Sequence, residues 1–240
     1  GIAQVDALHQ GYGFLSENQR FAEACQQAGI AFIGPSAKAI SLMGNKSNAR
    51  GIARELGIPV LDGVTGTMKE LMEAKDRLPY PLLIKPAAGG GGKGMRIVKS
   101  VHHFESEAKE ASREALNYFG SDELYVEKYL EKPRHIEVQV IADQMGNAVH
   151  LFERECTLQR RYQKIIEESP SPALDEELRQ RMGEAACKVM ATAGYTNAGT
   201  VEFLLDKNKK VYFLEMNTRL QVEHPVTEMV TELDLVQEQI

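Results

Sequence analysis

The chain has 240 residues, of which 43% are hydrophobic and 26% are charged, so it is long enough to bury a sizeable core. This composition excludes an intrinsically disordered chain. The formal net charge of −6, with no basic run longer than two residues, argues against a broad basic surface for nucleic acids or anionic membranes.

Capping residues and glycines predict helices and short strands in the first half of the chain. Ser16 and Gln19 have the spacing of a capping box, and so do Thr67 and Glu70. Ser36 is a further N-cap residue. The expected helices are 16–29, 36–44, 47–57 and one that begins after 67, and the expected strands are 31–33 and 81–85.

The second half of the chain is richer in strands. The expected elements are strands at 124–129, 135–142 and 148–153 and one long helix at about 175–193. Two more strands follow, one with Glu202 and one with Glu215. Loop-forming residues near 59–66 and 121–122 indicate that the segment between them is a small subdomain, in the form of a hinged lid. The sequence therefore predicts a mixed α/β (α+β) fold.

Three cysteines, Cys25, Cys156 and Cys187, are odd in number and far apart. They predict neither a disulfide framework nor a structural zinc site, and they favour a reducing compartment. No apolar stretch approaches the roughly 20 residues that span a bilayer. The first residues are typical of neither a signal nor a transit peptide, so we expect a cytoplasmic protein, or an organelle-matrix protein if a targeting segment was removed.

Two acidic strands predict a metal site. Glu202 and Glu215 each lie in an otherwise apolar run, where an unpaired buried carboxylate costs several kcal/mol. Residues two apart on a strand share a face, so Asn217 points the same way as Glu215, and Glu202 can join them from the neighbouring strand. Such oxygen ligands suit Mg²⁺ or Mn²⁺. The alternative is a pair of edge strands whose acids lie in water.

A glycine-rich loop follows the strand at 81–85. Lys85 precedes Gly89 to Gly92, and then Lys93 and Gly94. Consecutive glycines let backbone N–H groups approach phosphate oxygens closely. The loop is not a Walker A motif, because no Ser or Thr follows Lys93, and a strand rather than a helix comes next. It indicates a flap over nucleotide phosphates, with a flexible surface hairpin as the alternative.

Several segments together resemble biotin carboxylase, a family of the ATP-grasp superfamily. They are Lys46 after Gly44-Asn45, Lys85 with the tetraglycine loop, Glu127-Lys-Tyr-Leu130, Pro133-Arg-His135-Ile-Glu-Val-Gln, Gln159-Arg-Arg-Tyr162-Gln-Lys164 and Glu215-Met-Asn-Thr-Arg-Leu-Gln-Val-Glu-His-Pro. The resemblance covers essentially the whole chain. It implies an ATP-grasp fold with a small mobile lid, preceded by the end of a Rossmann-like N-terminal domain.

The same resemblance implies domain boundaries. Residues 1–45 are expected to be the C-terminal part of the N-terminal (pre-ATP-grasp) domain, and residues 46–240 the ATP-grasp domain, with its lid at about 57–129. The family's C-terminal domain is not in this sequence, so the chain is expected to be truncated at both ends.

The resemblance implies ATP-dependent carboxylation of biotin on a carrier protein, with bicarbonate as the carbon source and carboxyphosphate as the intermediate. ATP and Mg²⁺ or Mn²⁺, as two ions, are the implied cofactors. The residues implied for them are Lys46 and Lys85 at the phosphates, Gly91 and Gly92 over the phosphates, Glu127 with the backbone of Lys128 and Leu130 at adenine, His135 and Gln159 at the ribose, and Glu202, Glu215 and Asn217 at the metal ions.

The resemblance implies a second set of residues for the chemistry of bicarbonate and biotin. Lys164, Arg219, Gln221 and the backbone of Val222 are expected to bind bicarbonate, since a planar anion suits the forked donors of a guanidinium. Glu223 is expected to be the general base, and Arg219 to stabilise the enolate-like oxygen of the ureido ring. Implied partners are a biotin carboxyl carrier protein or domain, a carboxyltransferase component and a second copy of the chain in a homo-oligomer.

Three positions depart from the family pattern. Gln10 stands where proline is common, Asn45 where aspartate is common and Tyr162 where histidine is frequent. None is in the expected ligand set. Two other functions stay open, namely an ATP-grasp ligase of the carbamoyl-phosphate synthase type and a non-catalytic nucleotide-binding module. The sequence does not distinguish among an acyl-CoA, an acetyl-CoA and a pyruvate carboxylase as the system to which the complete enzyme belongs.

Overall fold

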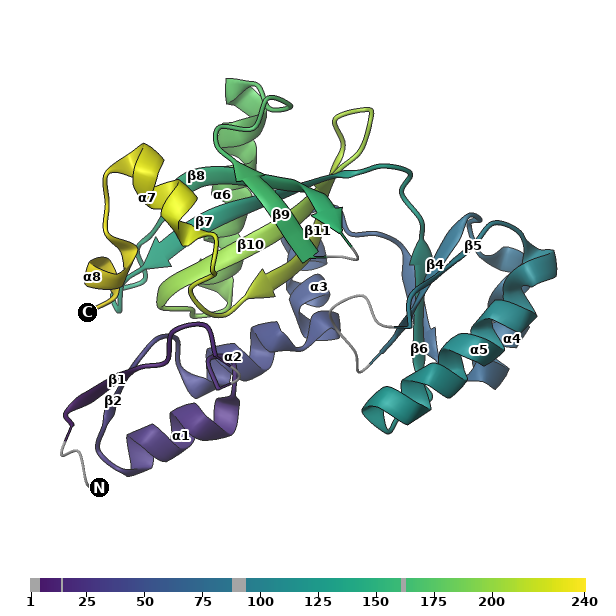
Figure 1. The fold of residues 1–240 in the computed structure, drawn as a ribbon, viewed down its shortest axis with the longest axis horizontal. Coiled ribbons are helices and arrows are strands. Elements are labelled where there is room, and N and C mark those ends of the chain that lie inside the picture. Colours follow the sequence, from purple (N-terminus) through teal and green to yellow (C-terminus); the bar gives the residue numbers. More distant parts are fainter. Residues whose placement is uncertain (1–4, 14, 88–93, 161–162) are drawn as a thin grey trace. The chain divides into compact units, whose positions relative to one another are not determined.

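The computed structural model describes residues 5–13, 15–87, 94–160 and 163–240, and it divides into two compact units (Figure 1). Unit 1 comprises Gly1–Val60, Pro133–Leu158 and Ile165–Ile240, and unit 2 comprises Leu61–Lys132 and Gln159–Lys164. Each unit has its own hydrophobic core. The chain therefore leaves unit 1 twice and returns to it twice.

Unit 1 begins with a small α/β segment. Its elements are β1 (Ala7–His9), α1 (Gln19–Gln27), β2 (Ala31–Ile33), α2 (Ala37–Gly44) and α3 (Lys46–Glu55), and β1 pairs with β2 in parallel. Ser36 caps α2 as predicted, because its hydroxyl accepts the backbone N–H three residues later at 3.2 Å. The capping box predicted at Ser16 is wrong. Asn18 caps α1 by accepting from the Phe21 N–H at 3.0 Å, while the Ser16 hydroxyl donates to a carbonyl within the preceding turn.

The main sheet of unit 1 has the order β11-β10-β7-β8-β9. Its strands are β7 (Arg134–Ala142), β8 (Ala148–Arg160), β9 (Gln163–Glu168), β10 (Asn197–Leu205) and β11 (Val211–Asn217). Helix α6 (Glu176–Thr192) packs against one face, where it forms the main core with Val138, Val201 and Phe203 (Figure 1). Asp175 caps α6, and the predicted helix at 175–193 is confirmed.

Some elements of unit 1 were not predicted. Strand β8 continues to Arg160, well past the expected end at residue 153, and β9 follows it. After β11, a turn leads to α7 (His224–Thr231) and α8 (Leu235–Gln239). Helix α7 begins directly after Glu223, with Pro225 in its first turn, where a missing N–H costs nothing. The turn therefore ends at the residue expected to be the general base.

Unit 2 is a four-stranded sheet with helices. Its elements are β3 (Gly63–Gly66), α4 (Met68–Ala74), a 3₁₀ turn (Lys75–Arg77), β4 (Leu82–Pro86), β5 (Arg96–Val98), α5 (Val101–Phe119) and β6 (Leu124–Lys128), with the strand order β3-β6-β4-β5. The predicted capping box is confirmed at α4: the Thr67 N–H donates to Glu70 at 2.8 Å, and the Glu70 N–H donates to the Thr67 hydroxyl at 3.5 Å. Helix α5, which was not predicted, buries Phe104 against β4.

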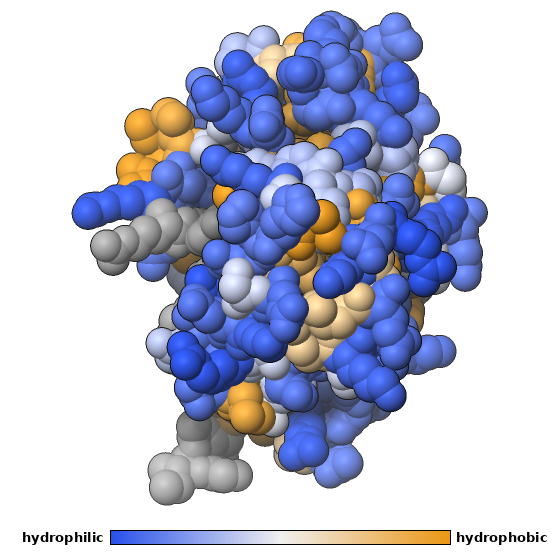
Figure 2. Space-filling view, turned by 90° about the vertical axis from the view of Figure 1, so that its right-hand side faces the viewer, coloured by the Kyte–Doolittle hydropathy of each residue, from blue (hydrophilic) through white to orange (hydrophobic). Residues whose placement is uncertain are grey.

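The described surface carries few large apolar side chains on the face shown in Figure 2. Hydrophilic residues cover most of that face, and apolar ones form small separate groups. Such scattered apolar residues are normal on a surface that faces water. Among the described residues, every helix is too short or too polar to span a lipid bilayer.

Candidate functional site

A row of four charged residues crosses the main sheet of unit 1. Arg154 on β8 pairs in register with Glu137 on β7, Glu137 with Glu202 on β10, and Glu202 with Glu215 on β11. Directly paired residues point to the same face of a sheet. This face is opposite to the one covered by α6, because the neighbours of Glu202 in the chain, Val201 and Phe203, lie in the core beneath α6. We call these four residues the charged row.

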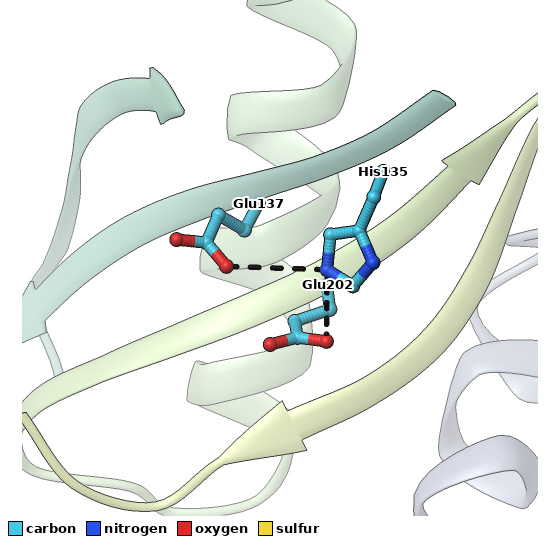
Figure 3. A group of neighbouring side chains, drawn as sticks. All are labelled: His135, Glu137 and Glu202. Atoms are coloured by element: carbon cyan, nitrogen blue, oxygen red, sulfur yellow. Dashed lines mark ion pairs between the residues drawn. The ribbon is translucent and has the colours of Figure 1, made fainter. Parts of the chain in front are cut away.

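The three carboxylates of the charged row occupy adjacent strands, and like charges directly opposite one another destabilise a sheet. Each has a basic partner. The Nε of Arg154 lies 2.6 Å from the Glu137 carboxylate, and the Nζ of Lys46 lies 3.2 Å from that of Glu215. The Nε2 of His135 lies 3.0 Å from Glu202 and 4.0 Å from Glu137 (Figure 3).

Two amides also contact Glu202. Its Oε1 accepts from the Asn217 side-chain amide at 2.8 Å and from the Gln221 side-chain amide at 3.1 Å. Glu202 is 4% exposed, so these bonds satisfy a carboxylate that is almost completely removed from water. The structure thus brings together Glu202 and Asn217, and it pairs Glu215 with Glu202 in the sheet register, as the alternation of the strands indicated.

The donor set of this face fits a divalent cation. One ligand atom each from His135, Glu137 and Glu202 lies within 4.8 Å of the others. Carboxylate oxygens at adjacent positions are what Mg²⁺ and Mn²⁺ prefer, and their mutual repulsion is relieved by a bound positive charge. Glu137 was missed at the sequence level. Its signal was present, because it lies two residues after His135 on a strand and so shares its face.

The turn after β11 is held by a residue from the start of the chain. Glu17 accepts from the Thr218 N–H at 2.8 Å and from the Arg219 Nε at 3.2 Å. A second N–H of Arg219 donates to the carbonyl of Leu220 at 3.1 Å. These bonds fix the position of a guanidinium that was expected to bind an anion. Glu17 lies about 200 residues away in sequence, and no local pattern links it to this turn.

The residues that follow in the same turn differ in exposure. Gln221 is 3% exposed, whereas Val222 is 66% exposed. Glu223 is partly buried, and one of its carboxylate oxygens lies within 4.8 Å of a Glu137 oxygen and of the Cys156 sulfur. The expected base therefore lies beside the charged row.

Unit 2 carries the residues expected at the phosphates and the adenine. Lys85 on β4 forms an ion pair with Glu127 on β6, and its Nζ lies 5.8 Å from the centre of the Tyr125 ring. Glu127 is 2% exposed. The backbone N–H of Lys128 donates to the Asp62 carbonyl at 3.1 Å.

The structure also describes Leu130, Lys164 and Gln159. Leu130 follows β6, and the partly buried Lys164 and the exposed Gln159 lie in the short second segment of unit 2. Gly91 and Gly92, like Tyr162, lie outside the described residues.

Two family models match the chain. The model of the biotin carboxylase N-terminal domain matches residues 2–40, and that of the carbamoyl-phosphate synthase L chain, ATP binding domain, matches residues 45–240. Biotin carboxylase 1 of Bacillus subtilis (strain 168) is 52% identical over 243 residues, which cover 100% of this chain and 54% of that protein. The mitochondrial methylcrotonoyl-CoA carboxylase subunit alpha of Rattus norvegicus is 52% identical over 239 residues, which cover 98% of this chain and 33% of that protein.

Solved structures agree with these relatives. The crystal structure of a biotin carboxylase-β-γ-ATP complex from Campylobacter jejuni matches with a TM-score of 0.93 and 49% identity, over 99% of this chain and 54% of that one. The biotin carboxylase domain dimer of Hydrogenobacter thermophilus 2-oxoglutarate carboxylase, in complex with MgADP, ADP and bicarbonate, matches with a TM-score of 0.92 and 45% identity, over 99% and 53%. The chain spans about half the length of the biotin carboxylases it matches. It belongs to the biotin carboxylase family, and its residues 45–240 match the ATP binding domain of the carbamoyl-phosphate synthase L chain.

Proposed function

We propose that the complete protein carrying this chain is a biotin carboxylase. It transfers carboxylate from bicarbonate to carrier-linked biotin in an ATP-dependent reaction that passes through carboxyphosphate, the first half-reaction of a biotin-dependent carboxylase. The observation that carries this proposal is the charged row with Arg219 and Glu223 in the turn beside it. A cation site next to an arginine and a partly buried acid suits phosphoryl transfer to a small anion.

One group of residues is proposed to bind the nucleotide. Lys46 and Lys85 would neutralise phosphate oxygens, with Gly91 and Gly92 covering them. The metal ions, when bound, supply Lewis-acid neutralisation of the phosphate charge. The residues proposed to hold them are Glu202, Glu215 and Asn217, and those proposed at the nucleoside are Glu127, the backbone of Lys128 and Leu130, His135 and Gln159. The pairing of Lys46 with Glu215 supports a site in which cation and phosphate ligands are neighbours.

The carbon side uses the turn after β11. Arg219, oriented by Glu17, would bind bicarbonate together with Lys164 and the backbone of Val222. The side-chain amide of Gln221 would also bind bicarbonate. Glu223 would take the bicarbonate proton, and later, through the phosphate that is released, help to remove the proton from biotin. Arg219 would then stabilise the enolate-like oxygen of the ureido ring.

The proposed domain limits and partners follow the same reasoning. Residues 1–45 would complete an N-terminal domain, and residues 46–240 would form the ATP-grasp domain, with 57–129 as a mobile lid; the separate core of unit 2 supports the lid. The partners would be a biotin carboxyl carrier, a carboxyltransferase component and a second copy of the chain. Relatives include mitochondrial and chloroplastic proteins, and we propose a cytoplasmic or organelle-matrix location.

ATP hydrolysis by the complete protein tests the proposal. The assay contains Mg²⁺ and bicarbonate, with and without free biotin, and a Glu223→Gln variant is measured in parallel. We expect hydrolysis that depends on both bicarbonate and biotin and that is lost in the variant. Hydrolysis that is indifferent to biotin but coupled to ammonia would instead establish a ligase of the carbamoyl-phosphate synthase type. ATP binding with no hydrolysis under any of these conditions would establish a nucleotide-binding module.

A further inference from the structure

Arg154 is the largest fully buried side chain of the described residues, with 0% of its surface exposed. A guanidinium has five N–H donors, and here all five are used. The acceptors are Glu137 for Nε at 2.6 Å, Gln139 and Thr227 for Nη1 at 2.8 and 2.7 Å, and Thr200 and Gln221 for Nη2 at 3.3 and 2.9 Å. The side chain is therefore held in one orientation.

The acceptors of Arg154 come from four separate elements. Glu137 and Gln139 lie on β7, and Thr200 lies on β10. Gln221 lies in the turn before α7, and Thr227 lies on α7 itself. One buried cation therefore ties the sheet to the segment that includes Glu223.

The contact with Gln221 determines which way that amide points. Arg154 can only donate, so the oxygen of the Gln221 amide must face it, and the amide nitrogen is turned towards Glu202, to which it donates at 3.1 Å. Arg154 and Glu202 fix the amide from opposite ends, because one only donates and the other only accepts, so a residue at position 154 that cannot reach Gln221 would remove one of these two constraints. The orientation of Gln221, between the charged row and the turn, thus depends on a residue that is itself shut away from any ligand.

Stability alone does not account for this arrangement. Taking a charge out of water is costly, and well-packed apolar residues of similar volume often serve as well as a buried ion pair. The Arg154 network satisfies every donor, and two of its acceptors, Glu137 and Gln221, belong to the candidate site. That distribution favours a role in orienting the site.

We infer that Arg154 is a positioning residue for the bicarbonate side of the reaction, acting through the amide of Gln221. This inference rests on the proposed function. Among the described residues, the hydrogen-bond acceptors of Arg154 do not include Lys46, so its loss should affect bicarbonate more than ATP. Lysine cannot replace it, because an ammonium has three donors and no planar fork.

The test is a double-mutant cycle in the complete protein with Arg154→Lys, Gln221→Ala and the double variant. We expect Arg154→Lys to raise the KM for bicarbonate at least tenfold while the KM for ATP stays within twofold. Because both changes act on one amide, the double variant should lose no more than about twofold in kcat/KM for bicarbonate beyond Gln221→Ala alone. Arg179→Lys is the matched control, since Arg179 is a largely buried arginine of unit 1 that pairs with Glu153.

Two results overturn the inference. One is an unchanged bicarbonate KM in Arg154→Lys despite a loss of thermal stability like that of Arg179→Lys. The other is a double variant whose losses multiply, which means that Arg154 does not act through Gln221. If Arg154→Lys does not fold, Thr200→Val takes its place, because it removes the other acceptor of Nη2; an unchanged bicarbonate KM there also overturns the inference.

Failure of the proposed function can be told apart from failure of the inference about Arg154. If ATP hydrolysis by the wild-type protein does not depend on biotin, the carboxylase proposal is refuted, but the double-mutant cycle in kcat/KM for bicarbonate can still be measured. A readout independent of catalysis is proton exchange of the Gln221 side-chain amide by NMR, which we expect to be slow in the wild type and accelerated in Arg154→Lys. Equal exchange rates in the two proteins contradict the positioning role.

Discussion

Substitution of Lys46, which forms an ion pair with Glu215, distinguishes a role in ligand binding from a role in stability. Both side chains are partly exposed, at 46% and 34%, and their atoms are 3.2 Å apart. Exposed pairs of this kind contribute about 0–1 kcal/mol to stability. Lys46→Met should therefore lower the free energy of unfolding by no more than about 1 kcal/mol.

The same substitution should weaken ATP binding strongly. A hydrogen bond to a charged group is worth about 1.5–3 kcal/mol, and every 1.4 kcal/mol is tenfold in affinity. If Lys46 binds a phosphate, Lys46→Met should raise the Kd of magnesium-bound ATP by about 10-fold to 150-fold. Isothermal titration of the complete protein with a non-hydrolysable ATP analogue measures this directly.

Lys209→Met is the matched control. Lys209 forms a similar exposed ion pair with Asp175, at 2.7 Å and with side chains 60% and 55% exposed. We expect its affinity for the analogue to equal that of the wild type. A Lys46→Met protein that folds normally and binds the analogue within twofold of the wild type would refute the phosphate role of Lys46.

Four further predictions concern single side chains. Phe203→Ala should lower the free energy of unfolding of unit 1 by about 3–5 kcal/mol, because the ring is fully buried; a loss below 1 kcal/mol in urea denaturation contradicts the described core. Ser36→Ala should cost about 1 kcal/mol in the same assay through the lost N-cap of α2, whereas Ser36→Asn should cost little. Glu223→Gln should keep the affinity for magnesium-bound ATP and reduce bicarbonate-dependent turnover by about 100-fold or more, and a large loss of ATP affinity would assign Glu223 to the nucleotide instead. Burial, with Glu184 nearby, raises the pKa of the Cys187 thiol, so at pH 8 less thiolate is present than in an ordinary cysteine, and maleimide should react with it more slowly than with the denatured chain; equal rates would contradict this.

Local signals in the sequence located the side-chain caps of α2 and α4 but misplaced the cap of α1. Ser36 and Thr67 accept the hydrogen bonds expected of them, because such bonds depend only on residues three positions apart. Helix α5 escaped prediction for the opposite reason. Its N-cap residue, Ser100, makes no side-chain capping bond, so no capping pattern in the sequence marks where the helix begins.

Some residues of the candidate site could likewise be predicted from the sequence, and others could not. Strand alternation placed Glu202 and Asn217 on one face, and the structure joins them at 2.8 Å. Arg154 escaped notice, because it reaches the site through the register of β7 and β8, and long-range register is set by the whole sheet. Glu17 depends on an even longer separation. Contacts between distant segments need the fold before they can be seen.

The charged row sets stability and binding against each other. Three carboxylates on adjacent strands weaken the sheet that carries them, and a cation that binds only the folded state restores that stability by mass action. We therefore expect the melting temperature of the protein to rise with the free concentration of such a cation, so that this sheet would report whether the site is occupied.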